Sequence, residues 1–291
     1  MLSILIPTFN DDVTPLVERL CREIQRTEAP IELIIGDDHS TREAALSNLQ
    51  NLKSVLIFRN TENLGRTATR HLLAQKAKYK KLLFLDADVL PAQDDFIKKY
   101  LLALGTSQVV FGGVQYKKEK PAQAMLLRWI YGKKREAKTA QERQRNPHYI
   151  ISQNLLIDKQ VFLSLNAPDV KRYGWDNVFS FQLYRQGISV KHIDNPVIHT
   201  GLESCESYLS KVEQAMQTIV WAEKREMISE DFTSIQKFFN TMSRLRLSGL
   251  LSACLGPFLP IMRGQLASKF PSVRVLDLYK FYYFSKYKHK G

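Results

Sequence analysis

The sequence is poor in cysteine, and its apolar stretches are short or interrupted. Its three cysteines, Cys21, Cys205 and Cys254, stand far apart and form no Cys-x-x-Cys pair. A disulfide framework and a structural zinc site are therefore not expected. The cysteine usage fits a reducing, cytosolic compartment. The first residues reach Pro7 without a basic segment, so the start of the chain does not resemble a secretory signal. The uncharged stretch 247–262 contains two prolines and is shorter than the ~20 residues that span a bilayer.

Two common phosphate-binding motifs are also missing. No Gly-x-Gly-x-x-Gly follows the first expected strand, which excludes a dinucleotide fingerprint. No Gly-x-x-x-x-Gly-Lys-Ser/Thr occurs, which excludes a P-loop. The phosphates of any bound nucleotide must therefore be neutralised in another way.

The composition is that of a globular protein, but its net charge of +13 is unevenly distributed. Residues 1–116 carry no net charge, whereas residues 117–145 carry +7 and residues 237–291 carry +9. The remaining segment, 146–236, carries −3. A nucleic-acid-binding core would carry a basic face of its own, so this distribution argues against nucleic acid as a partner. It favours two basic appendages on a neutral core.

Short apolar runs alternate with helical patterns in the first part of the chain. Strands are expected at 2–6, 32–36, 55–58, 82–85 and 109–112. Helices are expected after Thr14, the predicted N-cap, after a Ser40–Glu43 capping box, and over 66–78. Strand–helix alternation with continuous apolar strands predicts an α/β domain with a mostly parallel sheet.

Polar side chains follow three of the predicted strands. They are the segment 7–11 after the first strand, Asp37 and Asp38 after the second, and Asp86 and Asp88 after the fourth. Ligands of parallel sheets bind beyond the carboxyl ends of the strands, so three acidic clusters at that edge favour a binding site over simple turn residues. The two aspartates of Asp-Ala-Asp offer hard oxygen ligands, which suit Mg²⁺ or Mn²⁺ bridging to a diphosphate.

Four segments, in this order, resemble glycosyltransferase family two, the inverting enzymes with the GT-A fold. They are ILIPTFN, IELIIGDDHST, NLGRTATRHLLAQKAKYKKLLFLDADVLP and YGWDNVFSFQLYRQGISVKHIDNPVIHTG. The resemblance implies a Rossmann-like nucleotide-diphospho-sugar transferase domain over residues 1–205. Within it, residues 1–115 would bind the nucleotide and residues 116–205 the acceptor. Residues 206–291 would form a helical extension.

The family also implies roles for the matching positions. The nucleotide would contact Pro7, Thr8, Phe9, Asn10, Asp37, Asp38, Arg70 and Asp86, with Asp38 accepting a base N–H. Mn²⁺ or Mg²⁺ would be held by Asp88, Asp86 and His199. Without the resemblance, His199 has the alternative of a packed or capping histidine.

Asp176 is implied as the general base, which removes the proton of the acceptor hydroxyl. The family's usual Glu-Asp pair is replaced here by Trp175-Asp176-Asn177. Alignment through the following helical segment places Asp176 on the Asp and Trp175 on the Glu, and we prefer it for its spacing. Alignment from Tyr173-Gly174 instead places Asp176 on the Glu and Asn177 on the Asp. Asp176 would also suit the N-cap of a helix over 177–186.

The middle basic segment, residues 117–145, has two interpretations. It is either a helix with a solvated basic side or a lid over the active site, from which Arg143 or Lys133 reaches the diphosphate. Trp175 and Asn177 are further candidates for the acceptor side. Asn154 lies in a segment that resembles the family's returning strand.

The last part of the chain is basic and aromatic. A helix is expected over 206–227, and six aromatic residues between Tyr279 and Tyr287 are interleaved with lysines. Such rings and charges are typical of the membrane interface. Two alternatives are a helical subdomain packed on the core and a surface for single-stranded nucleic acid, which the acidic clusters disfavour.

The sequence therefore predicts a metal-dependent inverting glycosyltransferase, peripheral on the cytoplasmic face of the cell membrane. The donor would be a nucleotide-sugar, with UDP as the family's commonest nucleotide, and the acceptor a glycan or a lipid-linked hydroxyl. One alternative is a sugar nucleotidyltransferase, which would need a glycine-rich loop where PTFNDD stands. Another is a degenerate domain that binds a membrane or a polyanion.

Overall fold

The structure is a computed structural model that describes residues 1–42, 49 and 55–289. These residues form two compact units, which we call unit 1 and unit 2. Unit 1 consists of residues 1–117, 136–171 and 186–201, and unit 2 of residues 118–135, 172–185 and 202–291. The border after residue 201 lies close to the predicted domain boundary at 205. Residues 118–135 and 172–185, which we predicted within the catalytic domain, instead group with the C-terminal helices.

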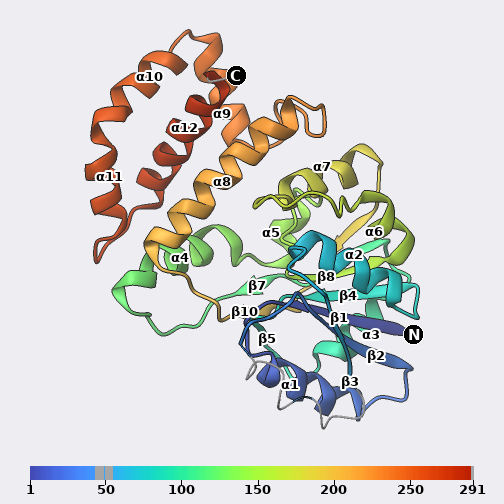
Figure 1. The fold of residues 1–291 in the computed structure, drawn as a ribbon. Coiled ribbons are helices and arrows are strands. Elements are labelled where there is room, and N and C mark those ends of the chain that lie inside the picture. The colour runs from blue at the N-terminus through green and yellow to red at the C-terminus, as the bar shows by residue number, and fades with distance from the viewer. Residues whose placement is uncertain (43–48, 50–54, 290–291) are drawn as a thin grey trace. The chain divides into compact units, whose positions relative to one another are not determined.

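Unit 1 is built on a seven-stranded sheet in the order β3-β2-β1-β4-β8-β6-β9 (Figure 1). The strands are β1 (Leu2–Thr8), β2 (Ile31–Asp37), β3 (Val55–Arg59), β4 (Lys81–Leu85), β6 (Val109–Phe111), β8 (Asn154–Asp158) and β9 (Val190–His192). The first four are parallel to one another, as are β6 and β9, and β8 runs antiparallel to both β4 and β6. The prediction of an α/β, mostly parallel sheet is confirmed.

Helices cover both faces of this sheet, which explains why central strands such as β1 and β4 are buried on both sides. On one face, α1 (Thr14–Ile24) and α3 (Phe96–Ala103) share a buried core with alternate residues of β1. On the other face lie α2 (Arg66–Lys76) and α6 (Lys159–Leu165), where Phe84 of β4 packs on Phe162 of α6 at 4.4 Å between ring centroids. A shorter helix, α5 (Ala140–Gln144), begins with a capping box at Thr139.

The predicted start of the first helix differs from the structure by one residue, and the predicted start of the second cannot be compared with it. The N-cap of α1 is Val13, and the helix begins at Thr14. The prediction of Thr14 as the cap is therefore wrong by one residue; the Thr14 main-chain N–H instead donates to Oδ1 of Asp12. The predicted Ser40–Glu43 capping box and its helix fall largely outside the described residues.

A second sheet of three short strands completes unit 1. Its order is β5-β10-β7, formed by β5 (Val89–Pro91), β10 (Val197–His199) and β7 (Val114–Gln115). Strand β10 is antiparallel to β5, with His199 opposite Val89. This register brings the last residue of β10 beside Asp88, the residue that precedes β5.

Unit 2 is helical. Its elements are η3 (Gln123–Met125), α4 (Leu126–Tyr131), η4 (Gly132–Glu136), α7 (Asp176–Arg185), α8 (Cys205–Glu223), α9 (Ser234–Arg244), α10 (Ser248–Leu255), η5 (Gly256–Phe258), α11 (Leu259–Leu266) and α12 (Val273–His289). Helix α12 packs along α8 around a shared apolar core. The helical C-terminal extension is thus confirmed, although its first helix ends at Glu223, four residues earlier than predicted.

The aromatic tail forms much of this core. Tyr279, Phe281, Tyr283 and Phe284 of α12 are all buried. These four rings do not face solvent, so they offer no platform for a lipid interface or for nucleic-acid bases. Among the described residues no single helix has the length and apolar composition of a membrane span, although α9 and the helix 248–266, bent by 111°, meet that test as a pair.

Candidate active site

The acidic clusters gather at one edge of the seven-stranded sheet, as predicted. Strands β1 and β2 are parallel and in register from Leu2 opposite Ile31 to Thr8 opposite Asp37. Strand β4 lies on the other side of β1 in the same direction, so Asp86 follows at the same edge. Pro7 and Thr8 are buried at the end of β1, whereas Phe9 is 43% exposed. Phe9 therefore presents an aromatic ring at this edge.

Asp38 holds the turn that leads into α2. Its Oδ1 accepts hydrogen bonds from Asn60 Nδ2 at 2.9 Å and from the Leu64 main-chain N–H at 2.8 Å. Its Oδ2 accepts one from the Gly65 N–H at 2.8 Å. Gly65 has φ +88°, a left-handed conformation that favours glycine. The carboxylate is buried, and both of its oxygens accept hydrogen bonds from the protein. The base N–H that the family resemblance predicts for Asp38 would have to share one of these oxygens.

Asn10 ties the loop after β1 to the loop after β2. Its Oδ1 accepts hydrogen bonds from the main-chain N–H groups of Thr41 and Arg42, at 2.8 and 3.1 Å. Its own N–H donates to Oγ of Ser40 at 2.8 Å. Asn10 adopts φ +60°, which asparagine tolerates better than most residues. Asp37 supports the same loop, since its Oδ1 accepts from the Ser40 N–H.

Two arginines of α2 converge on Asp86. Nη2 of Arg70 lies 2.6 Å from Oδ1 of Asp86, and Nη2 of Arg66 lies 2.8 Å from Oδ2. Arg70 also donates to both Oγ and the main-chain oxygen of Ser152, at 2.7 Å each. Both carboxylate oxygens therefore already accept hydrogen bonds from guanidinium groups. Coordination of a metal by Asp86, as predicted, would have to displace at least one of them.

The same arginines control the titration of Asp86. Burial by itself would raise the pKa of this carboxyl, but the charges and hydrogen bonds of Arg66 and Arg70 lower it to about 2. The ionised form is therefore maintained at all ordinary pH values.

This depressed pKa predicts a pH-dependent contribution to stability. The contribution is complete above the unfolded-state pKa of 3.8 and is lost as the pH falls through about 2. We expect the stability difference between wild type and Asp86→Asn to shrink by up to about 2 kcal/mol as the pH falls from about 5 to about 2. Urea unfolding of both proteins over this range measures it. A difference that does not change with pH would contradict the assignment.

Asp88 and His199 form a second pair, placed by the small sheet. Nε2 of His199 lies 3.2 Å from Oδ2 of Asp88, and Thr200 donates its N–H to the Asp88 main-chain oxygen at 2.8 Å. His199 is buried, and a third of the Asp88 side-chain surface is exposed. A carboxylate oxygen beside an imidazole nitrogen is a donor set that suits Mn²⁺.

The protein supplies only part of a metal coordination shell here. Within residues 1–42, 49 and 55–289, no three His, Cys, Asp or Glu side chains are grouped so that they could hold a metal. Asp88 and His199 thus fit a cation whose remaining ligands come from the oxygens of a bound diphosphate or from water. Asp86, held by its arginines, does not join them in this arrangement.

Gly201 provides the space for Asp88. A Cβ at this position would lie 2.0 Å from Oδ2 of Asp88 and 2.7 Å from its Cγ, too close for real atoms. We therefore expect Gly201→Ala to push the carboxylate away from His199. The affinity for a nucleoside diphosphate with Mn²⁺, measured by calorimetry, should fall about tenfold or more, since displacement within a metal site typically costs 10–100-fold.

Gly264→Ala is the matched control, because nothing lies within 4 Å of a Cβ built there. It should leave the affinity unchanged. Equal affinities for Gly201→Ala and wild type would show that Asp88 does not contribute to binding.

Arg143 and Lys133, the two basic residues that were predicted to reach the diphosphate from the middle segment, contact other groups in the structure. The guanidinium of Arg143 is buried in unit 1, where it donates to the main-chain oxygens of Gly112, Lys138 and Ile193. Burial lowers the pKa of this group. With its Nη donors on main-chain oxygens and its Nε–H on Nδ1 of His192, Arg143 stabilises the loops around β6 and does not extend toward a diphosphate. Lys133, in unit 2, lies over the ring of Trp129.

Asn154 also has a structural role. Its Nδ2 donates to the main-chain oxygens of Gly113 and Asn195, and its Oδ1 accepts from the Tyr100 hydroxyl. The returning strand predicted around it is β8. The charge density of the middle segment indicated exposed cations, but it did not distinguish the buried arginine from the exposed lysine.

The acceptor-side candidates lie in unit 2. Asp176 is the first residue of α7 and is half-buried. Trp175, directly before it, is buried, and its Nε1–H has no hydrogen-bond partner among the described residues. Asn177 donates both its main-chain N–H and its Nδ2–H to the Gly174 oxygen. Asp176 thus opens the helix, one residue earlier than predicted, and Asn177 is engaged in the turn before it.

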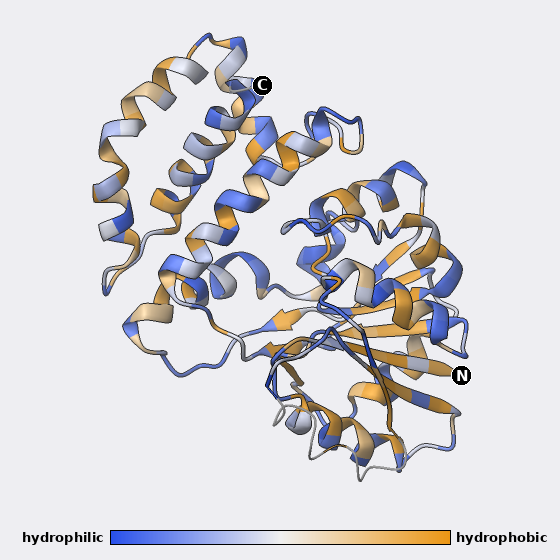
Figure 2. Ribbon diagram, viewed as in Figure 1, coloured by the Kyte–Doolittle hydropathy of each residue, from blue (hydrophilic) through white to orange (hydrophobic). Residues whose placement is uncertain are grey.

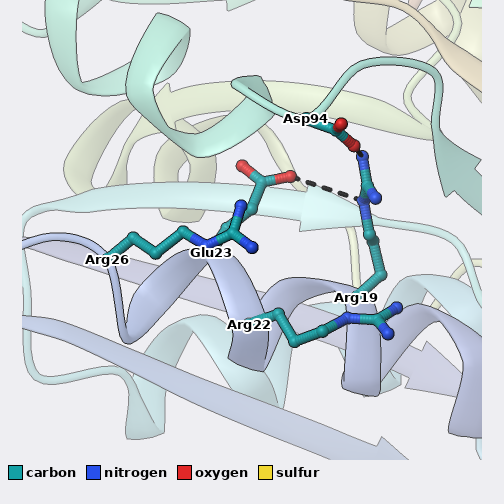
Figure 3. Close-up of a pocket in the computed structure, with 5 residues that line it drawn as sticks. All are labelled: Arg19, Arg22, Glu23, Arg26 and Asp94. Carbon is teal, nitrogen blue, oxygen red and sulfur yellow. Dashed lines mark hydrogen bonds and ion pairs between the residues drawn. The ribbon is translucent and has the colours of Figure 1, made fainter.

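A cavity of about 220 Å³ lies elsewhere in unit 1, among Arg19, Arg22, Glu23, Arg26 and Asp94 (Figure 3). Arg19 pairs there with both Asp94 and Glu23. The second half of α1 lines it, and α1 runs back from the carboxyl end of β1. The cavity is therefore remote from the edge that carries the acidic clusters, and it contains none of the predicted site residues.

Three residues of the site were not predicted from the sequence. Arg66 lies four positions before Arg70 on α2, and this spacing on one helix face could have indicated it. Ser152 and Gly201 gave no such signal, because their roles depend on contacts between distant segments.

Comparisons with known proteins identify the family and the fold. The family model described as "Glycosyl transferase family 2" matches residues 3–165. A search of curated proteins finds no match.

Three solved structures are similar in fold. The mannosyltransferase PcManGT from Pyrobaculum calidifontis, in complex with GDP-Man and Mn²⁺, has a TM-score of 0.59 at 14% identity, covering 99% of this chain and 86% of that one. GalNAc-T7 with UDP, GalNAc and Mn²⁺ has a TM-score of 0.53 at 18% identity, covering 84% and 54%. S. aureus TarS 1–349 has a TM-score of 0.50 at 13% identity, covering 99% and 90%.

These likenesses establish the GT-A fold, and the family match covers more than half of the sequence. The chain is a glycosyltransferase and belongs to glycosyl transferase family 2.

Proposed function

We propose that the protein is a metal-dependent, inverting glycosyltransferase that moves a sugar from a nucleotide-sugar to a hydroxyl of a glycan or lipid-linked acceptor. The observation that carries the proposal is the Asp88–His199 pair, 3.2 Å apart at the edge where β1, β2 and β4 end. Support for a metal also comes from PcManGT and GalNAc-T7, both solved with Mn²⁺. Either Mn²⁺ or Mg²⁺ suits the donor set.

Asp88 and His199 would hold the cation, which supplies positive charge to the leaving nucleoside diphosphate. The loops fixed by Asn10 and Asp38 would bind the base and ribose, with the exposed ring of Phe9 beside the base. Arg66 and Arg70 keep Asp86 ionised and add positive charge at the same edge. This charge takes the place of the missing glycine-rich phosphate loop.

Asp176 would act as the general base in the transfer step. It takes the proton of the acceptor hydroxyl while the acceptor oxygen bonds to the anomeric carbon and the bond to the diphosphate breaks. Attack from the face opposite the leaving group inverts the configuration at that carbon. This assignment rests on the family resemblance around Trp175-Asp176-Asn177.

A thermal-shift screen of UDP-, GDP- and other nucleotide-sugars, with and without Mn²⁺, tests the proposal. A specific donor stabilises the folded protein by mass action, by about 2.7 kcal/mol at a hundredfold excess over its Kd. We expect one nucleotide class to raise the melting temperature only when Mn²⁺ or Mg²⁺ is present. No stabilisation by any of them would favour the degenerate binding domain.

A further inference from the structure

The helix 248–266, formed by α10, η5 and α11, carries apolar residues on two neighbouring sides, which together cover about half of its circumference. One face packs into the core of unit 2 against α12. Its members, which follow one another at helical spacing, are Leu251, Leu255, Leu259, Met262 and Leu266. This face accounts for the folding of the helix onto its unit.

The neighbouring side, which we call the outer face, consists of Leu247, Leu250, Cys254, Phe258 and Ile261. Their spacing of three and four residues places them along one side of the helix. The four large apolar side chains are between 41% and 68% exposed, and Cys254 is exposed as well. No charged residue occurs between Leu247 and Met262. Figure 2 shows α10 and α11 coloured mostly from white to orange, the apolar half of the scale.

Such a face requires an explanation, because the apolar side of a surface helix normally faces the core, whereas this part of it is exposed. Scattered exposed apolar residues are ordinary, but a continuous row rimmed by polar residues marks an interaction surface. The aromatic residues of α12 do not belong to it, since Tyr279, Phe281 and Phe284 are fully buried. The outer face is thus an apolar surface that the helical extension presents to solvent.

The charges around the outer face favour an anionic lipid surface as its partner. Arg244 and Arg246 precede it, Lys269 and Arg274 follow it, and all four are exposed. No acidic residue lies between Asp231 and Asp277. A second copy of the chain would present the same positive charge, and the two copies would repel each other. Anionic phospholipid headgroups attract such basic clusters, and the acyl layer accepts the apolar row.

The helix is suited to lie in the interface and not to cross it. Its inner face is packed against α12, so lipid cannot surround it. We infer that the outer face docks on an anionic bilayer, with its apolar side chains at the boundary between headgroups and acyl chains and its basic flanks on the lipid phosphates. This inference is independent of the reaction that the protein catalyses.

Sedimentation with vesicles tests this surface. The full-length protein should bind vesicles of phosphatidylcholine with phosphatidylglycerol more strongly than vesicles of phosphatidylcholine alone. We expect Leu250→Ser/Phe258→Ser/Ile261→Ser to reduce the partition coefficient about tenfold or more, because three apolar side chains leave the lipid. The matched control is Leu56→Ser/Leu102→Ser, which changes exposed apolar residues of unit 1 and should bind as wild type does.

A second pair of variants tests the basic flank. Arg244→Gln/Arg246→Gln should weaken binding to the anionic vesicles and make it less dependent on salt, whereas Lys98→Gln/Lys118→Gln should not. Point substitutions are required because removal of the tail would take away α12 and with it the core of unit 2.

Cys254 offers a direct probe of immersion. An environment-sensitive fluorophore on Cys254, in a Cys21→Ala background, should shift its emission to the blue on addition of anionic vesicles. The other cysteine, Cys205, is buried and should not be labelled in the folded protein. Binding of the apolar triple variant equal to that of wild type would overturn the inference, as would a wild type that binds no vesicles. A wild-type dimer that the triple variant converts to a monomer, with vesicle binding unaltered, would assign the face to self-association and also overturn it.

Discussion

Asp176→Asn is expected to lower the rate of sugar transfer on the order of 10²–10⁴-fold, the usual contribution of a general base. An amide cannot accept the proton of the acceptor hydroxyl at neutral pH. Asparagine is also a good residue for a helix N-terminus, so α7 should begin as before. Steady-state kinetics should therefore show a loss in kcat, with donor affinity unchanged.

The controls for this variant are its two neighbours. Asn177→Ala removes a side chain that donates to the Gly174 oxygen, and Trp175→Phe keeps an aromatic ring but removes the indole N–H. Neither supplies a base, so both should retain most of the transfer rate. Undiminished turnover in Asp176→Asn would exclude it as the base, and a large loss in Asn177→Ala instead would favour the other alignment of this segment.

Asp88→Asn is expected to abolish the Mn²⁺-dependent part of donor binding. Even substitutions outside the ligand shell of a metal commonly cost 10–100-fold in affinity, so the loss of a ligand should exceed on the order of 10²-fold. Because its side chain is partly exposed and the hydrogen bond to Thr200 uses its main-chain oxygen, the melting temperature without ligand should change little. Calorimetry with a nucleoside diphosphate and Mn²⁺ measures the effect.

Asp86→Asn provides the contrast. This substitution breaks two ion pairs with Arg66 and Arg70 and leaves the buried Arg70 without its carboxylate. The melting temperature of the ligand-free protein should therefore fall. If Asp88 and His199 hold one ion together, the effects of Asp88→Asn and His199→Gln should not add in the double variant. Additive effects, or unchanged Mn²⁺ dependence in either single variant, would contradict the shared site.

Much of the fold could be predicted because the first four strands are continuous apolar runs, of which β1, β2 and β4 are largely buried. Their observed ends lie within two residues of the predicted ones, and the carboxylates after them meet at one edge. The start of α1 was misplaced because Val13, with no side-chain cap, precedes the helix. A threonine before a proline is a common N-cap pattern, and here it stands one position inside the helix.

The helical extension was harder to predict. The interleaving of aromatic residues and lysines in the tail did not reveal that Tyr279, Phe281 and Phe284 point into a core. Long lysine side chains can lie along a packed helix and keep their charge in water, so interleaving alone does not measure exposure. The outer face of 248–266 was missed for the same reason, since an uncharged run does not show which of its sides is covered.

The candidate site was proposed from residue types and from the order of the family segments, and the roles of its residues stay predictions. The contacts that the sequence did not reveal depend on tertiary structure. The pairing of Asp88 with His199 requires the register of β5 and β10, which are three residues long each and far apart in sequence. The structural role of Arg143 follows from its burial and from its hydrogen bonds to main-chain oxygens. Its charge in the sequence did not indicate either.

Product analysis is the most direct test of metal-dependent sugar transfer by this protein. The protein is incubated with the nucleotide-sugar that stabilises it, with Mn²⁺ and a panel of glycan and lipid-linked acceptors, and the nucleotide products are separated. We expect a nucleoside diphosphate, formed together with a glycosylated acceptor, and we expect both to disappear on chelation or in Asp88→Asn. Release of pyrophosphate, or release of nucleoside diphosphate unaffected by chelation, would contradict it.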